Sequence, residues 1–297
     1  MAFQKAVRKK AKLRLALTGP SGSGKTLGAL MIAKGLGGRV ACIDTEHGSA
    51  SLYSEHTEYP VPEFDVMELA PPYTPERYIA GIKEAEAAGY DVLIIDSTTH
   101  EWSGSGGILE LVDQVAAAKF RGNSWSAWNE LTPRHRAFID AMLQSKMHII
   151  ATGRSKTETA QVEENGRKKV AKLGMKTEQR DGFEYEFTVV LDIVHDGHYA
   201  VASKDRTGLF RGDAKPISEQ TGADLLNWLE TGETGPNVDA ILEGIRNAQN
   251  LPALKSHFEA AIQMLGKENR EAVIAAKDAR KAELDPQQEP QQQQEAA

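Results

Sequence analysis

The sequence of 297 residues contains a single cysteine, Cys42, and this scarcity narrows the possible classes of fold. One thiol cannot form a disulfide within the chain, and it cannot supply the cysteine sets of structural zinc sites. Cys42 stands inside an apolar run, so we expect it to be a buried core thiol. Stability must therefore come from a hydrophobic core, for which the length is ample.

Long apolar runs are also missing. No stretch approaches the roughly 18 apolar residues of a membrane-spanning helix, and no apolar segment follows the basic N-terminus as in a secretory signal. The sequence therefore predicts a cytoplasmic protein without a membrane partner.

The chain lacks an overall excess of positive charge. Its formal net charge of −7 argues against a protein that coats nucleic acid with its whole surface. The basic residues are concentrated in two segments, which are therefore candidate phosphate-contacting surfaces. The N-terminal segment has Lys5, Arg8, Lys9, Lys10, Lys12 and Arg14, and the later one has Arg154, Lys156, Arg167, Lys168, Lys169, Lys172, Lys176 and Arg180.

The most informative motif is a phosphate-binding loop of the form G-x-x-x-x-G-K-[ST]. It follows a predicted strand and precedes a predicted helix, which is the context that the motif requires. Its glycines let successive backbone N–H groups turn toward phosphates, Lys25 is expected to reach the β- and γ-phosphates, and Thr26 is expected to bind Mg²⁺. The predicted nucleotide-binding residues are Gly19, Pro20, Ser21, Gly22, Ser23, Gly24, Lys25, Thr26 and Leu27.

Short apolar strands alternate with helical stretches, which predicts an α/β fold with a mainly parallel sheet covered by helices on both faces. The last long strand runs into Asp196-Gly197, a two-residue hairpin signal, so we expect an antiparallel pair at the edge of the sheet. The predicted strands are 13–18, 39–44, 91–96, 148–152, 188–195 and 199–204, and the predicted helices are 27–36, 75–88, 133–145 and 217–229.

The sequence predicts a nucleotide-binding domain at 13–230, preceded by a basic lead-in at 1–12. Residues 231–236 have the small and helix-breaking composition of a linker. Apolar residues recur at helical spacing within 237–284, which predicts a small helical module. Residues 285–297 are rich in glutamine and are expected to form a disordered tail.

Two acidic residues follow predicted strands. Asp96 ends an apolar run, as does the carboxylate that P-loop proteins hold beside the metal, so it is expected to orient Mg²⁺ or its water. Glu46 follows the strand at 39–44 and is expected to emerge beside the γ-phosphate at the carboxyl edge of the sheet. There it would polarise the attacking water.

Residues 43–47 (IDTEH) resemble the corresponding segment of recombinases and motors with a RecA-like core. The resemblance implies a RecA-like P-loop ATPase with Glu46 as the catalytic base. Residues 204–208 (KDRTG) are similar to the K-x-R-x-G element of hexameric replicative helicases and bacterial RadA-type repair ATPases. This second resemblance implies that Lys204 and Arg206 reach the γ-phosphate of a neighbouring subunit, a contact worth on the order of 10³-fold or more in rate. A solvated turn is the alternative for this segment.

Over residues 10–230 the order of elements resembles the small phage-encoded ATPases with a RecA core that are grouped with single-strand annealing proteins. The resemblance implies ATP and Mg²⁺ as cofactors. As partners it implies single-stranded DNA, further copies of the chain in a ring or filament, and a single-strand-binding protein. One position departs from the RecA-like pattern, because the fourth strand ends without the polar amide that senses the γ-phosphate. Thr152 and Arg154 are the candidates to replace that amide.

In RecA-like assemblies two loops bind single-stranded DNA, and by position these are residues 103–129 and 155–181. The second loop is basic, and Asn165-Gly166 is the expected turn or hairpin tip of a mobile arm, although nearby acidic residues make a solvated loop the alternative. Trp125 and Trp128 are able to stack bases, but their spacing favours packing into a core. The predicted DNA contacts are Lys156, Arg167, Lys168, Lys169, Lys172 and Lys176.

Three functions follow from these motifs. The favoured one is an ATP-hydrolysing oligomer that binds single-stranded DNA and acts in recombination, annealing or repair. The second is a nucleotide-switched adaptor or loader of a replication complex, which would dock a partner with its helical module and bind DNA little. The third, a small-molecule P-loop kinase, leaves Glu46 and Arg206 without a role.

Overall fold

The chain folds into two compact units, one formed by residues 11–231 and one that contains the C-terminal helices, and each is described by itself. A search of the described helices for one with the length and hydropathy of a membrane span found none. Within residues 157–175 the structure describes the backbone of the two strands but not the side chains. A computed structural model describes residues 10–54, 58–59, 61–164, 167–232, 238–265 and 269–285.

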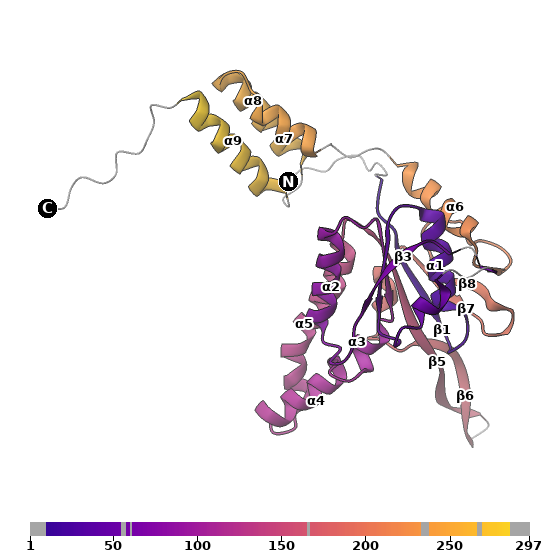
Figure 1. The fold of residues 1–297 in the computed structure, drawn as a ribbon. Coiled ribbons are helices and arrows are strands. Elements are labelled where there is room, and N and C mark those ends of the chain that lie inside the picture. Colours follow the sequence, from indigo (N-terminus) through magenta and orange to yellow (C-terminus); the bar gives the residue numbers. More distant parts are fainter. Residues whose placement is uncertain are drawn as a thin grey trace. The chain divides into compact units, whose positions relative to one another are not determined.

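The larger unit is built on a nine-stranded sheet that is mainly parallel, with β1 at its centre (Figure 1). Its strands run in the order β3-β2-β4-β5-β1-β7-β8-β9, and β6 pairs with β5 outside this path. The strands are β1 (Arg14–Gly19), β2 (Val40–Asp44), β3 (Phe64–Glu68), β4 (Val92–Asp96), β5 (His148–Glu164), β6 (Arg167–Thr177), β7 (Val189–Ile193), β8 (Tyr199–Asp205) and β9 (Lys215–Pro216).

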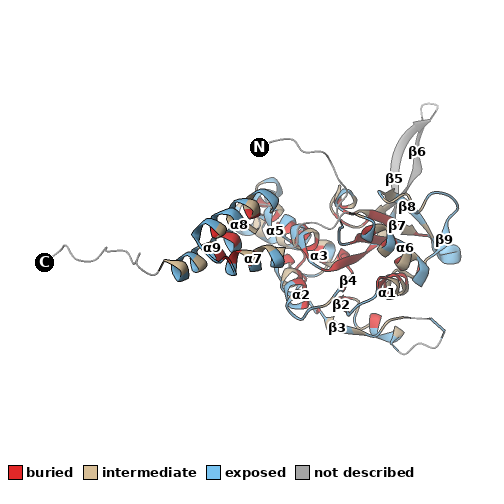
Figure 2. Cartoon of the chain, turned by 90° about the horizontal axis from the view of Figure 1, so that it is seen from above, coloured by how far each residue is buried: buried red, intermediate tan, exposed pale blue. Residues whose placement is uncertain are grey.

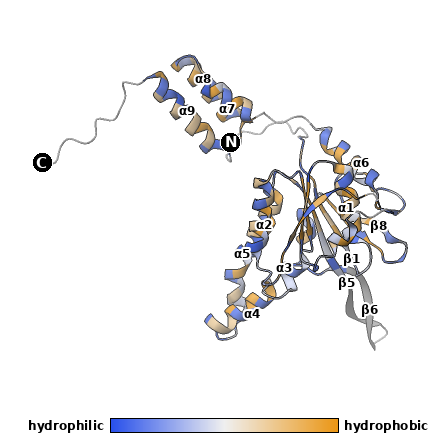
Figure 3. Cartoon of the chain, viewed as in Figure 1, coloured by the Kyte–Doolittle hydropathy of each residue, from blue (hydrophilic) through white to orange (hydrophobic). Residues whose placement is uncertain are grey.

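Helices cover both faces of this sheet, because alternate residues of the central strands are apolar on both sides. Leu15 and Leu17 of β1 pack with α1 and α6, whereas Ala16 packs on the side of α2 and α5. Figure 2 shows the buried residues concentrated on the central strands, and Figure 3 shows the same strands as the most hydrophobic part of the unit. The helices are α1 (Lys25–Leu36), α2 (Pro75–Ala87), α3 (Thr99–Ser103), α4 (Ile108–Lys119), α5 (Ser124–Gln144) and α6 (Glu219–Glu230).

The helices α1 and α6 approach each other closely at two glycines. A Cβ atom on Gly222 would lie 2.2 Å from the carbonyl oxygen of Ile32 and 2.9 Å from the Cα atom of Gly35. A Cβ atom on Gly35 would lie 2.0 Å from the carbonyl oxygen of Glu219. Both contacts are with backbone, which cannot rotate away, so only glycine fits this crossing.

Replacing Gly222 with alanine is expected to lower the free energy of unfolding of the larger unit by about 1–3 kcal/mol, the usual cost of overpacking. This change opposes the ordinary helix preference for alanine, which favours it over glycine by about 1 kcal/mol. Thermal and denaturant unfolding would measure the effect. Gly244→Ala is the matched control, since a Cβ atom there would meet its nearest neighbour at an ordinary 3.5 Å. Stabilisation by both substitutions would contradict the close crossing.

The mainly parallel sheet, the helices on both faces and the antiparallel edge agree with the sequence prediction. The predicted two-residue turn at Asp196-Gly197 is wrong, because residues 194–198 connect β7 to β8 and include a short 3-10 turn. The predicted helix at 133–145 begins earlier, at Ser124, and has Pro133 inside it. The elements β3, α3 and α4 were not predicted.

The segment expected to be a DNA-binding loop, residues 155–181, is largely a β-hairpin. The strand β5 continues well past the sheet and pairs with β6 from Ser155↔Thr177 to Glu164↔Arg167, with a register shift between Glu158 and Thr159. The predicted tip, Asn165-Gly166, lies outside the described residues. Figure 1 shows the hairpin extending beyond the carboxyl edge of the sheet, where the phosphate loop also lies.

The second compact unit contains three helices, α7 (Val238–Arg246), α8 (Leu251–Met264) and α9 (Arg270–Leu284). They enclose a small core in which Ile245, Ala261 and Val273 are fully buried. The Asn250 side chain begins α8 by accepting a hydrogen bond from the backbone N–H of Ala253 at 2.9 Å. The tail at 286–297 and most of the predicted linker lie outside the described residues.

Candidate nucleotide site

The phosphate loop joins the central strand β1 to the helix α1. Gly22 and Gly24 adopt φ angles of 76° and 93°, a region that favours glycine. A Cβ atom on Gly19 would lie 2.7 Å from the carbonyl oxygen of Ile193, so glycine is also required there. The loop thus has the backbone shape that the motif predicts, at the positive end of the α1 dipole.

The loop contains polar groups that fit a bound triphosphate. The Ser23 hydroxyl is buried and has no hydrogen-bond partner among the described residues. Lys25 extends along the loop and donates a hydrogen bond from Nζ to the carbonyl oxygen of Pro20 at 2.8 Å. Burial lowers the pKa of Lys25, with the carboxylates of Asp96 and Glu46 opposing the effect. A negatively charged phosphate bound in the loop would stabilise the charged form of Lys25 and so offset the effect of burial.

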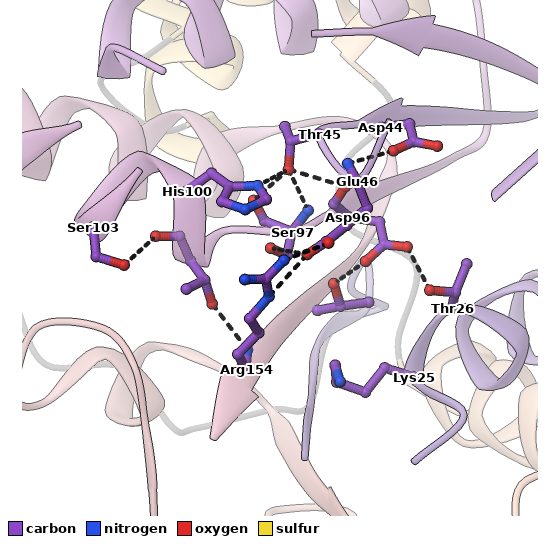
Figure 4. Close-up of polar contacts among 12 residues, drawn as sticks. Lys25, Thr26, Asp44, Thr45, Glu46, Asp96, Ser97, His100, Ser103 and Arg154 are labelled. Atoms are coloured by element: carbon purple, nitrogen blue, oxygen red, sulfur yellow. Dashed lines mark hydrogen bonds and ion pairs between the residues drawn. The ribbon is translucent and has the colours of Figure 1, made fainter. Parts of the chain in front are cut away.

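Thr26 and Asp96 form the pair expected to hold Mg²⁺. The Thr26 hydroxyl donates to Asp96 Oδ2 at 2.6 Å, and the Thr152 hydroxyl donates to Asp96 Oδ1 at 2.5 Å (Figure 4). Burial raises the pKa of Asp96, and these two hydrogen bonds partly offset the effect. A hydroxyl and a carboxylate are hard oxygen ligands of the kind Mg²⁺ prefers, so the residues present fit this ion.

Glu46 follows β2 on a turn that the buried Asp44 carboxylate organises. The Asp44 oxygens accept hydrogen bonds from the backbone N–H groups of Glu46 at 2.6 Å and Ala50 at 3.0 Å. Because Asp44 pairs in register with Asp96 on β4, Glu46 emerges next to the candidate Mg²⁺ site. The structure therefore brings together Lys25, Thr26, Asp96 and Glu46 at one edge of the sheet, as the sequence predicts (Figure 4).

The Glu46 carboxylate forms a bidentate ion pair with Arg154, at the point where β5 leaves the sheet. Arg154 Nη2 lies 2.5 Å from Glu46 Oε2, and Arg154 Nε donates to Oε1 at 3.1 Å. The Ser97 hydroxyl also donates to Oε1, at 3.1 Å. Burial acts to raise the pKa of Glu46, but Arg154, His100 and Ser97 outweigh it, so the net pKa is lowered.

The sequence left two candidates, Thr152 and Arg154, for the missing γ-phosphate sensor. The structure separates them: Thr152 binds Asp96, and Arg154 binds Glu46. Their partners lie 56 and 108 residues away along the chain, so no local pattern announces either contact.

Thr45 and His100 are site residues that the sequence did not reveal. The Thr45 hydroxyl lies 2.7 Å from His100 Nδ1 and accepts a hydrogen bond from the backbone N–H of Ser97 at 2.8 Å. Thr45 thereby fixes the end of β2 to the segment that follows β4. Burial lowers the pKa of His100, so neutral imidazole is favoured beside this threonine.

Two histidines of the β7–β8 connection also lie beside the phosphate loop. His198 Nδ1 is 3.0 Å from the carbonyl oxygen of Ser23, and a Cβ atom on Gly22 would lie 3.5 Å from His195 Nε2. The sequence gave no signal for this proximity, because it depends on the parallel pairing of β7 with β1.

Lys204 and Arg206 do not join the nucleotide site of their own chain. Lys204 Nζ donates to the carbonyl oxygens of Glu184, at 3.2 Å, and of Tyr185. The exposed Arg206 bonds through its backbone N–H to Thr188, which in turn bonds to Arg14 at the start of β1. The phosphate loop follows the other end of β1, one strand length away.

The turn that carries Arg206 is organised by the neighbouring Asp205. The Asp205 carboxylate accepts hydrogen bonds from the backbone N–H groups of Thr207 at 2.7 Å, Gly208 at 3.0 Å and Phe210 at 3.0 Å. The Thr207 hydroxyl donates a further hydrogen bond at 2.6 Å, and together these bonds outweigh the effect of burial and lower the pKa of Asp205. An ordered turn, rather than a loosely solvated one, therefore presents Arg206 to solvent.

The candidate DNA contacts fall on β5, which contains Lys156, and on β6. Arg167, Lys168, Lys169 and Lys172 lie on β6, while Lys176 lies near its end and pairs with Asp181 at 2.7 Å. The prediction that the tryptophans pack into a core is correct for Trp128, which stacks on Trp102 with ring centroids 5.8 Å apart. It is wrong for Trp125, whose side chain is 85% exposed.

A phosphate loop between the central strand and the first helix, with acidic residues at the ends of the adjacent strands β2 and β4, characterises a P-loop nucleotide-binding domain. The family model described as AAA domain matches residues 11–215, and the protein belongs to this family. It is thus a P-loop ATPase with a RecA-like fold. A search of curated proteins gave no match.

Proposed function

We propose that the protein is an oligomeric, Mg²⁺-dependent ATPase that binds single-stranded DNA in recombination, annealing or repair. The observation that carries the proposal is the course of β5. This strand presents Thr152 to Asp96 and Arg154 to Glu46, and then continues into the basic hairpin. The nucleotide site and a candidate DNA-binding arm are thus parts of one element.

Each residue of the nucleotide site has a role in hydrolysis. Lys25 would hold the β- and γ-phosphates, while Thr26 and Asp96 would hold Mg²⁺, which neutralises phosphate charge when bound. Glu46 accepts a proton from the attacking water, so its carboxylate must first leave the ion pair with Arg154. Arg154 is then free to contact the γ-phosphate, a role for which its fork of N–H donors is suited.

Arg206 supports the oligomeric part of the proposal. It lies a strand length from the phosphate loop of its own chain, on an ordered turn that exposes its guanidinium. ATP bound to a second copy of the chain would bring a γ-phosphate to this arginine. The site would then be completed by a cation from a neighbouring subunit.

The strand register of the hairpin separates its basic residues into two groups. Arg167 is paired in register with Glu164 and Lys168 with Glu163, so the register partner of each is acidic. Lys169 lies opposite Val162 and Lys172 opposite Thr159, neither of which carries charge. Lys169 and Lys172 are therefore the members of the pair of strands best suited to bind phosphates.

The double variant Lys169→Ala/Lys172→Ala is expected to weaken binding of single-stranded DNA and to reduce the slope of log affinity against log salt by about 1.4, since each lost phosphate contact contributes about 0.7. Arg167→Ala/Lys168→Ala is the matched control and should have the smaller effect. Fluorescence anisotropy of labelled oligo(dT) over a range of salt concentrations measures both. Equal slopes for the wild type and the first variant would refute these contacts.

A nucleotide-switched adaptor is the second candidate function, because the C-terminal helices form a compact unit of their own. Phosphate release from ATP, measured with and without oligo(dT), separates the candidates. Stimulation by the oligonucleotide supports the DNA-dependent ATPase, whereas unstimulated turnover that still requires Lys25 supports the adaptor. Formation of ADP and free phosphate, with no phosphorylated acceptor, excludes a small-molecule kinase.

A further inference from the structure

A cavity of about 800 Å³ lies outside the nucleotide site, between the first half of α5 and the segment that follows β6. Neither the phosphate loop nor Asp96, Glu46 or Arg154 contributes to its wall. Its lining is rich in aromatic and cationic side chains and includes Trp102, Trp125, Trp128, Asn129, Arg136 and Arg180.

The tryptophans of the cavity provide flat apolar surfaces. Trp102 and Trp128 are stacked with an interplanar angle of 28°, which fixes the orientation of both rings. Trp125 is 85% exposed, at the start of α5, where the Asn123 side chain accepts a hydrogen bond from the backbone N–H of Ser126. The fold therefore holds a large aromatic side chain in solvent on an ordered helix, with its ring free to receive a flat ligand.

The charge at the cavity is positive beside these rings. The Arg180 guanidinium carbon lies 5.3 Å from the centre of the Trp128 ring, and its Nη1 donates to the Thr132 hydroxyl at 3.3 Å. Arg136 is exposed, and no side-chain hydrogen bond or ion pair involves it in the described part of the chain. The acidic member of the lining, Asp181, is paired with Lys176.

We infer that this cavity binds the bases of single-stranded DNA, with Trp125 stacking on a base and Arg136 and Arg180 contacting the adjoining phosphates. The inference rests on the proposed function, which it extends by naming a second contact site beside the hairpin. An exposed flat ring next to two guanidinium groups matches a ligand that alternates aromatic bases with phosphates. Stacking accepts every base, so binding here is expected to be independent of sequence.

The cavity is also joined to the nucleotide site by hydrogen bonds. Gln179, in its wall, donates from Nε2 to the carbonyl oxygen of Thr98 at 3.1 Å, two residues after Asp96. The neighbouring Glu178 donates its backbone N–H to the carbonyl oxygen of Arg154 at 2.7 Å. A strand held in the cavity would therefore lie next to the root of the hairpin and the edge that carries the ATP site.

The test compares labelled oligo(dT) with an abasic strand of equal length and charge, using the full chain. Wild-type protein should bind oligo(dT) more tightly. Trp125→Ala should remove this preference and weaken oligo(dT) binding by roughly 5- to 150-fold, the range for the loss of one stacked base. Trp125→Phe, which keeps a ring, should restore most of it. Tyr185→Ala is the matched control, because this aromatic residue is 76% exposed and lies outside the cavity wall.

Three results are informative. Loss of base preference in Trp125→Ala, with Tyr185→Ala unchanged, supports the inference. Unchanged oligo(dT) affinity in Trp125→Ala overturns it while leaving DNA binding by the hairpin intact, and would assign the cavity to an aromatic side chain of a protein partner. Failure of the wild type to bind either strand overturns both the inference and the DNA-binding part of the proposed function.

Discussion

Glu46→Gln is expected to bind ATP as the wild type does and to turn it over about 10²- to 10⁴-fold more slowly, the usual contribution of a general base. Glutamine keeps the size of the side chain and its hydrogen bond from Ser97, but it cannot accept a proton from water. It also weakens the link to Arg154, which now binds both carboxylate oxygens. Single-turnover hydrolysis and a binding titration with a non-hydrolysable analogue separate chemistry from affinity.

Glu178→Gln is the matched control for Glu46. Glu178 lies near the same edge, where its carboxylate accepts a hydrogen bond from Ser103 at 3.1 Å, but it has no contact with the nucleotide loop among the described contacts. Its turnover should stay near that of the wild type. Full turnover by Glu46→Gln would show that another group activates the water.

Lys25→Ala is expected to lower the affinity for ATP by roughly 10- to 150-fold, the equivalent of losing one strong hydrogen bond to a charged group, and to abolish hydrolysis. Lys25 donates a hydrogen bond to Pro20 within its own loop, and burial lowers the pKa of Lys25. Removing this side chain therefore costs the folded loop little, while a triphosphate loses its main positive partner. Calorimetric titration with an ATP analogue measures the change.

Lys34→Ala provides the control for Lys25, since Lys34 lies on the same helix and forms a partly exposed ion pair with Glu219 at 3.4 Å. Such pairs contribute about 0–1 kcal/mol to stability, so affinity and turnover should be unchanged. If Lys25→Ala bound the ATP analogue with wild-type affinity, the phosphate loop would not be the nucleotide-binding site.

Much of the fold and the candidate site followed from local patterns. The phosphate loop, Asp96 and Glu46 were predicted because each stands at a fixed place relative to an apolar strand, and parallel strands bring those places to one edge. The strand β3 was missed because Phe64–Glu68 is an edge strand with mixed, half-exposed residues rather than an apolar run. The first half of α5 was missed because Pro133 is typical of a helix start.

Other features depend on contacts between distant segments. The pairing of Arg154 with Glu46 requires β5 and β2 to lie on either side of β4, which no local spacing encodes. The position of Arg206 at the far end of β1 depends on the register of β8 with β7. The exposure of Trp125 is another such feature, since helical spacing alone gives both tryptophans of α5 the same face, yet Trp125 is exposed.

The strand β5 joins the hairpin to the nucleotide site through one continuous stretch of backbone. Thr152 and Arg154 lie two residues apart on this strand. A displacement of the strand along its axis would therefore change the Thr152–Asp96 hydrogen bond and the Arg154–Glu46 ion pair together. Bending of the hairpin differs from such a displacement, because the irregularity between Glu158 and Thr159 is a place where the strand bends locally. A displacement of β5 along its axis would therefore alter the contacts of both carboxylates, whereas bending at the irregularity would leave those contacts in place.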